Sequence, residues 1–184
     1  MAKKKQVIVI HHNTWDHKTT PISCPSDSLD DLIEELDHLI DEDKIKELSK
    51  GKVTVVRSQF GESDRAKSMT AAQDMLTANP TMTAIFGPNE SSAVGALNAI
   101  RSRQQLGKIK IVGFDTPDIL VEAVRKGDVD SIVVQNPFKM GYEGVKAIVD
   151  KKAGKDVKPR IDTGVKLITT ADIDKPESKE WLQG

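Results

Sequence analysis

Short apolar runs alternate with amphipathic stretches along this chain of 184 residues, and this alternation restricts its fold more than any other feature. The runs predicted to be strands are Gln6–Ile10, Val53–Val56, Met82–Phe86, Ile109–Phe114 and Ser131–Val134. The stretches predicted to be helices are Ser28–Leu48, Asp64–Ala78, Ser91–Gln105, Pro117–Lys126 and Met140–Lys152. Continuous apolar strands that alternate with helices are typical of a parallel sheet with right-handed crossovers.

Five such strand–helix units predict a three-layer α/β/α sandwich with a flavodoxin-like, Rossmann-like parallel sheet in the strand order 2-1-3-4-5. Gly164–Ile168 is predicted to add a C-terminal edge strand, and the polar tail through Trp181 is expected to lie on the surface. We expect residues 1–184 to form a single α/β domain. Within it, Met140–Lys152 is expected to pack on its own sheet, because an exposed apolar stripe would promote aggregation. In the alternative interpretation this helix swaps into a second copy, and the single-domain prediction is then wrong.

The charges of the chain nearly balance, with 27 Lys and Arg residues against 28 Asp and Glu residues. This balance favours neither nucleic acid nor a membrane surface as a partner, and no apolar run approaches the roughly 20 residues of a membrane span. Val7–Ile10 follows three lysines but is too short for the hydrophobic region of a signal peptide, so the sequence does not indicate secretion. The single Cys24 cannot form an internal disulfide, so the compartment stays undetermined.

Three predicted strands end in, or shortly before, a polar side chain. These side chains are Asn89, Asp115 and Gln135. Because the carboxyl ends of parallel strands meet at one edge of a sheet, we expect a row of hydrogen-bonding groups there. Amides and a carboxylate suit the recognition of hydroxyl groups rather than bond breaking, which predicts a binding protein and not an enzyme. In the alternative interpretation, Asn89 and Asp115 only cap the helices that follow them.

Several motifs occur together, in order, in the last 130 residues or so of the chain. They are Asp64-Arg65-Ala66, Met75–Pro80, Ala84–Phe86, Asn89, Gly95-Ala96, Val112–Asp115, Val134–Pro137, Met140-Gly141 and Thr163–Thr169. From about Gly51 to its end, the chain therefore resembles the C-terminal lobe of type I periplasmic sugar-binding proteins, the ribose-binding-like receptors of ABC transporters. The resemblance implies an extracytoplasmic family without a cofactor, in which two lobes close on a sugar and Asn89, Asp115 and Gln135 bind its hydroxyls.

The chain also departs from that family. It has no room for a complete first lobe, and the predicted acidic helix Ser28–Leu48 lacks the arginine that would reach the sugar. Ser63 stands where many relatives carry an aromatic residue that stacks on the sugar ring. Residues 1–50 do not match the resemblance, which predicts a junction near Lys50–Gly51 in a truncated, chimeric or engineered chain. We expect such a half clamp to bind a sugar weakly or not at all, because small-molecule sites enclose most of their ligand.

Two other functions have support in the N-terminal part of the chain. Potential metal ligands gather within the loop His11–Ser26, which could instead hold a metal or an anion in a flavodoxin-like domain. They are His11, His12, Asp16, His17 and Cys24. Their spacing matches no standard metal motif, and the loop lacks the glycines of a phosphate-binding turn, which argues against flavin mononucleotide. The acidic face of Ser28–Leu48 could also dock a basic protein, and we expect the chain itself to be a monomer or a weak dimer.

Overall fold

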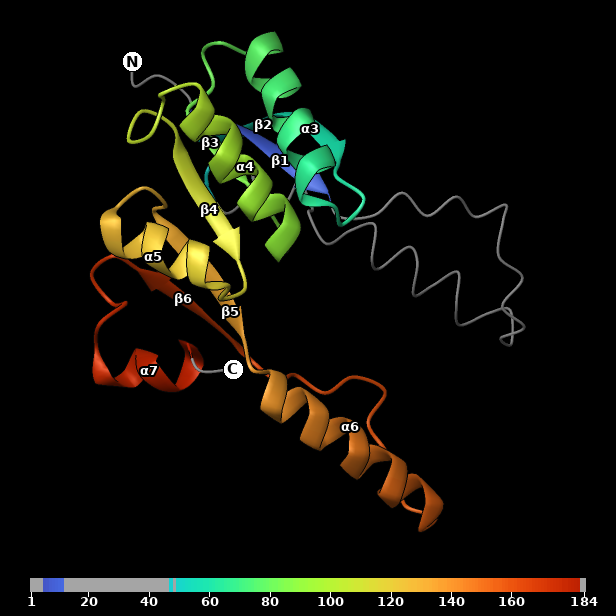
Figure 1. The fold of residues 1–184 in the computed structure, drawn as a ribbon. Coiled ribbons are helices and arrows are strands. Elements are labelled where there is room, and N and C mark those ends of the chain that lie inside the picture. The colour runs from blue at the N-terminus through green and yellow to red at the C-terminus, as the bar shows by residue number, and fades with distance from the viewer. Residues whose placement is uncertain (1–4, 12–46, 48, 183–184) are drawn as a thin grey trace, which may run out of the picture.

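The computed structural model describes residues 5–11, 47 and 49–182, and the strands among them form one six-stranded sheet (Figure 1). The strands are β1 (Lys5–His11), β2 (Val53–Phe60), β3 (Ala84–Phe86), β4 (Lys110–Phe114), β5 (Ser131–Gln135) and β6 (Val165–Thr169). Their order in the sheet is β2-β1-β3-β4-β5-β6, with all neighbours parallel except β6, which pairs antiparallel with β5. The predicted α/β class, the order 2-1-3-4-5 and the C-terminal edge strand are confirmed.

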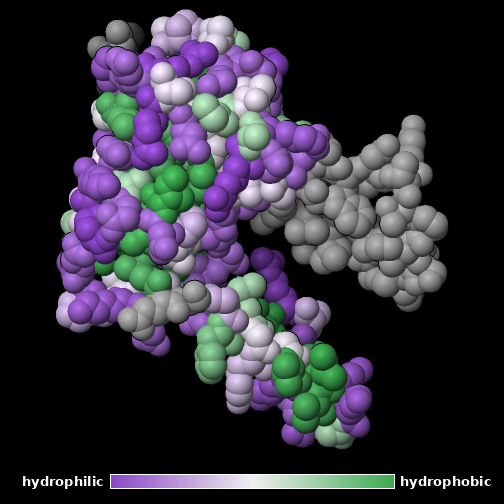
Figure 2. Space-filling model, in the orientation of Figure 1, coloured by the Kyte–Doolittle hydropathy of each residue, from purple (hydrophilic) through white to green (hydrophobic). Residues whose placement is uncertain are grey.

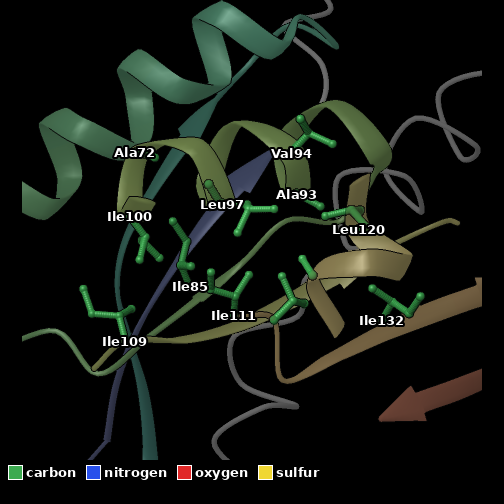
Figure 3. Close-up of a cluster of buried hydrophobic side chains, with 14 of the residues drawn as sticks. Ala72, Ile85, Ala93, Val94, Leu97, Ile100, Ile109, Ile111, Leu120 and Ile132 are labelled. Atoms are coloured by element: carbon green, nitrogen blue, oxygen red, sulfur yellow. The ribbon is translucent and has the colours of Figure 1, made fainter. Parts of the chain in front are cut away.

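Among the described residues, four helices lie against one face of this sheet (Figure 1). They are α3 (Arg65–Ala78), α4 (Glu90–Ser102), α5 (Asp118–Lys126) and α7 (Pro176–Leu182). The hydrophobic core lies between these helices and the sheet, and its central side chains, among them Ile85, Leu97, Ile111 and Ile132, are fully buried (Figure 3). Burial of apolar side chains on this one face is the main source of stability of the described fold.

The closest helix contact in this layer depends on a glycine. A Cβ atom added to Gly95 of α4 would lie 2.5 Å from Ser68 Cβ and 2.7 Å from the backbone nitrogen of Met69, both on α3. Only glycine lets the two helices approach this far, so the motif Gly95-Ala96 has a packing role.

The C-terminal tail differs from the prediction that it lies on the surface. Residues 176–182 form α7, and Ile173, just before this helix, is buried. Trp181 and Leu182 are partly buried against the core. The polar composition of the tail concealed this contact, because only a few of its side chains face inward.

The predicted helix Met140–Lys152 forms as α6 (Pro137–Lys152), but its predicted packing on the sheet is wrong. None of its residues is buried, and it projects away from the rest of the fold (Figure 1). The physical reason is its start: only Asn136 separates α6 from β5, and Pro137 is already its first residue. Since turns from a strand to a helix usually need two to six residues, α6 continues outward and adds no second helical layer.

Most predictions for the N-terminal part of the chain concern residues that the structure does not describe. Ser28–Leu48 except Glu47, and His11–Ser26 except His11, lie outside the described part, so the metal, anion and acidic-helix hypotheses stay predictions. Within the described ranges, no group of three or more His, Cys, Asp or Glu side chains is placed to hold a metal ion. No helix in the same ranges combines the length and the hydrophobicity that a membrane crossing requires.

Candidate functional site

The three residues predicted for the binding edge lie at or just after the ends of neighbouring strands. β3, β4 and β5 run parallel and side by side, so Asn89, Asp115 and Gln135 emerge at the same edge of the sheet. All three side chains are half-buried, which leaves part of each accessible to a ligand.

The structure joins two of these residues directly. Gln135 Nε2 donates a hydrogen bond of 3.0 Å to Asp115 Oδ1. The backbone N–H of Asp115 donates to the carbonyl of Val133 over 2.9 Å, which fixes the residue at the edge of β5. The pair is therefore held by both side chain and backbone before any ligand arrives.

Asp115 has an unusual backbone. Its φ of 64° lies in the left-handed region, which costs a non-glycine residue about 1–2 kcal/mol and is tolerated best by Asp and Asn. It is not a helix cap, because the residue at the N-cap of α5 is Pro117 and no side chain caps that helix. The capping interpretation is thus wrong for Asp115, and a strained residue of this kind at a strand end is typical of functional sites.

Asn89, in contrast, does cap its helix. Its Oδ1 accepts hydrogen bonds from the backbone N–H of Ser92 (2.9 Å) and from Ser92 Oγ (2.6 Å), and Ser92 Oγ accepts the N–H of Asn89 in return. The capping interpretation is confirmed for this residue. The cap uses the carbonyl end of the amide, and among the described residues Nδ2 has no protein acceptor.

The groups that remain for a ligand are both donors and acceptors. Asp115 Oδ2 and Gln135 Oε1 can accept, and Asn89 Nδ2 can donate, alongside the bonds already described. A hydroxyl group both donates and accepts, so this set matches a molecule that carries several hydroxyls.

Sequence reasoning missed an ion pair beside this edge. Arg65, at the start of α3, pairs with Glu90, the residue that follows Asn89, and Ser91 Oγ donates 3.0 Å to the carbonyl of Ser63. These contacts tie the beginnings of α3 and α4 together. The only signal in the sequence was the opposite charge of two residues 25 positions apart, which does not reveal that the helices are neighbours.

A hollow of about 420 Å³ lies elsewhere on the surface, between β2 and α3. Its lining is Gln59, Phe60, Glu62, Ala66, Lys67, Thr70, Ala71 and Asp74. β1 and β3 separate β2 from β4 in the sheet, so the hollow is not continuous with the Asp115–Gln135 pair. The hollow therefore does not include the residues predicted for the binding edge.

Comparison with known proteins shows the family of the chain. The sequence pattern of the periplasmic binding protein domain matches residues 26–156, which is more than half of the chain. The chain belongs to this family. The match begins before Gly51, so the predicted junction at Lys50–Gly51 lies inside the matched range.

Curated relatives of the family cover a large part of the chain. The ribose import binding protein of Salmonella typhimurium is 35% identical over 120 residues, which are 64% of this chain and 39% of that protein. The D-allose-binding periplasmic protein of Escherichia coli is 34% identical over 104 residues, which are 56% of this chain and 33% of that protein. The chain thus spans between one third and two fifths of the length of these relatives.

Solved structures extend the similarity over nearly all of the chain. A carbohydrate transporter solute binding protein from Agrobacterium radiobacter, in complex with D-arabinose, aligns with a TM-score of 0.73 and 26% identity, and the alignment covers 97% of this chain and 55% of that one. A solute binding protein of an ABC transporter from Agrobacterium vitis, bound with alpha-D-tagatopyranose, aligns with a TM-score of 0.75 and 26% identity over 97% of this chain and 54% of that one.

These comparisons confirm the predicted relationship to the sugar-binding receptors of ABC transporters, which are binding proteins and not enzymes. The single-domain organisation and the separate origin of residues 1–50 stay predictions, as does a chimeric or engineered history. None of them is needed for the binding edge, because its residues all lie within residues 26–156.

Proposed function

We propose that this chain is a sugar-contacting receptor lobe that binds a pentose or hexose through Asn89, Asp115 and Gln135 and catalyses no reaction. Two relatives are named for ribose and D-allose, and two of the similar structures hold D-arabinose and alpha-D-tagatopyranose. All four ligands are small molecules with several hydroxyls. The proposal carries this ligand class over to the present chain.

The observation that carries the proposal is the hydrogen-bonded pair Asp115–Gln135 at the ends of two adjacent strands. A carboxylate forms stronger hydrogen bonds to hydroxyls than a neutral acceptor does, and the amide of Gln135 orients it. Asn89 Nδ2 then donates from the third strand end to an oxygen of the same sugar. In this proposal, hydroxyls of one sugar bind all three groups.

The binding is weak in this proposal. The three side chains contact one side of a sugar only, whereas small-molecule sites usually bury 70–90% of the ligand. We expect a dissociation constant in about the millimolar range, equivalent to about −4 kcal/mol. Ser63, in place of a stacking aromatic residue, is consistent with this low affinity.

Calorimetric titration with D-ribose, D-allose, D-arabinose and D-tagatose tests the proposal, with L-ribose as a stereochemical control. At least one D-sugar should bind in the millimolar range. Asp115→Gly removes the carboxylate but tolerates the left-handed backbone, so it should abolish binding without unfolding the chain. Asn89→Asp keeps the cap acceptor and replaces the Nδ2 donor by a carboxylate oxygen that only accepts, so it should weaken binding at nearly unchanged stability. If no sugar binds, or if Asp115→Gly binds as well as the original chain, the proposal is wrong.

A further inference from the structure

The amide group of Asn89 is bonded on one side only, to Ser92 in the first turn of α4. The backbone N–H of Ser92 can only donate, so the atom that it meets at 2.9 Å must be the amide oxygen of Asn89, Oδ1. Ser92 Oγ donates to the same oxygen over 2.6 Å. Two donors occupy both lone pairs of Oδ1, so the other branch of the amide, Nδ2, is turned away from Ser92.

The hydroxyl of Ser92 is used in both directions. Its proton goes to the nearer acceptor, Asn89 Oδ1 at 2.6 Å, and not to the Asn89 carbonyl at 3.1 Å. Its oxygen accepts the backbone N–H of Asn89 over 3.2 Å. Because only 1% of Ser92 is exposed, water does not compete for these bonds, and a buried hydrogen bond is stronger than one in water. Ser92 therefore restrains both the backbone and the side chain of Asn89.

The turn that carries Ser92 lies directly on the chain that follows β3. A Cβ atom added to Gly87 would lie 2.5 Å from the backbone nitrogen of Ala93 and 2.8 Å from the carbonyl carbon of Ser92. The N–H of Gly87 donates over 3.0 Å to the carbonyl of Val112 in β4, so Gly87 is itself attached to the sheet. Only glycine allows this approach, and the contact leaves the first turn of α4 little room to shift relative to the strand ends.

Ser91, the neighbouring serine, makes a different contact. The outer surface of α3 and α4 is largely hydrophilic (Figure 2). Ser91 Oγ donates an exposed hydrogen bond of 3.0 Å to the carbonyl of Ser63. This contact joins the starts of the two helices but does not involve the amide of Asn89. The two serines therefore form a matched pair, of which only Ser92 can orient that amide.

We propose that Ser92 is a positioning residue of the sugar site, which turns Asn89 Nδ2 toward the ligand and leaves Asn89 as a donor only. This inference rests on the proposed function, because it names the group that orients one of the three binding residues. Since Oδ1 is occupied twice, the ligand must offer Nδ2 a lone pair, as a hydroxyl or a ring oxygen does. A mobile amide would lose rotamer freedom on binding, and Ser92 restricts that freedom before the ligand arrives.

A double-mutant cycle tests this role by calorimetry, with whichever of the four D-sugars named above binds most tightly. Ser92→Ala should weaken binding by about threefold to tenfold, because it removes one hydrogen bond to Oδ1. Ser91→Ala, the matched control, should leave the affinity unchanged. In a chain that carries Asn89→Asp, Ser92→Ala should cause no further loss of affinity, because Nδ2 is absent. A further loss of the same size would show that Ser92 does not act through this amide.

The side chain of Asn89 can also be observed without a sugar. Three-bond couplings in NMR spectra of labelled protein report whether its χ1 angle holds one rotamer. We expect one rotamer in the original chain and in Ser91→Ala, and averaging between rotamers in Ser92→Ala. A single rotamer in Ser92→Ala, or an unchanged sugar affinity, would overturn the role of Ser92 alone. Absence of sugar binding to the original chain would overturn the proposed function as well, whereas the couplings would still show whether Ser92 orients the amide.

Discussion

α4 and α6 are both amphipathic helices that follow a strand, yet their surroundings are opposite. Eight of the 13 residues of α4 are buried, and none of the 16 residues of α6 is. α4 packs against both the sheet and its neighbour α3, where Gly95 allows close packing, while α6 leaves the fold through a hinge of one residue. An apolar stripe therefore predicts that a helix forms and needs a partner, but not where the partner is.

The largest difference in the loss of stability is expected between alanine variants of two isoleucines, one in the core and one in α6. Ile111, in β4 beneath α4, is fully buried, whereas Ile148 in α6 is 61% exposed. Ile111→Ala should lower the free energy of unfolding by about 2–5 kcal/mol, because it leaves a cavity. Ile148→Ala should change it by less than about 0.5 kcal/mol. Urea denaturation at low protein concentration measures both, and a similar loss in the two variants would show that α6 is packed.

Replacement of a glycine by alanine should change the stability in opposite directions in α4 and in α6. Gly95→Ala should destabilise the chain by about 1–3 kcal/mol, because its methyl group would clash with α3. Gly144→Ala meets open space and should stabilise the isolated helix by up to about 1 kcal/mol. Circular dichroism during thermal unfolding can follow both variants. A loss of stability at Gly144 under monomeric conditions would contradict the exposed arm.

Asn89 and its cap should give a smaller effect. Asn89→Ala removes the acceptor for the N–H of Ser92 and should cost about 1 kcal/mol. Asn89→Asp keeps the acceptor and should cost almost nothing. Equal stability of the Ala and Asp variants in urea would mean that the cap does not form.

The smallest effect is expected on the stability of the fold at acid pH. Lys175 and Thr169 hold the pKa of the Asp172 carboxyl at about 2, and Lys146 and Lys155 do the same for Asp150 in α6. A lowered pKa adds stability that is complete above the usual value of 3.8 and is lost as the pH falls toward about 2. Asp172→Asn should slightly reduce the loss of global stability between these pH values. Asp150→Asn should not change the loss of global stability, because α6 is outside the core. The same change in the pH profiles of both variants would contradict the independence of α6 from the core.

The sheet could be predicted from the sequence because each strand is a short apolar run that alternates with an amphipathic helical stretch. The strand order followed from the similarity of five strand–helix units to flavodoxin-like folds, and the edge residues Asn89, Asp115 and Gln135 followed from their place at or after the strand ends. The hydrogen bond between Asp115 and Gln135 and the strained φ of Asp115 depend on the register of β4 and β5, which no local pattern gives. The direction of α6 depends on the length of its hinge, and the helical pattern does not contain that information.

The most direct test of the binding edge is a titration of labelled protein with D-ribose, followed by amide chemical shifts in NMR spectra. We predict saturable shifts in the millimolar range at Asn89, Asp115 and Gln135, none in the second half of α6, and no saturable shift in Asp115→Gly. Shifts that grow without saturation, or that appear equally in Asp115→Gly, would contradict a sugar site at these strand ends.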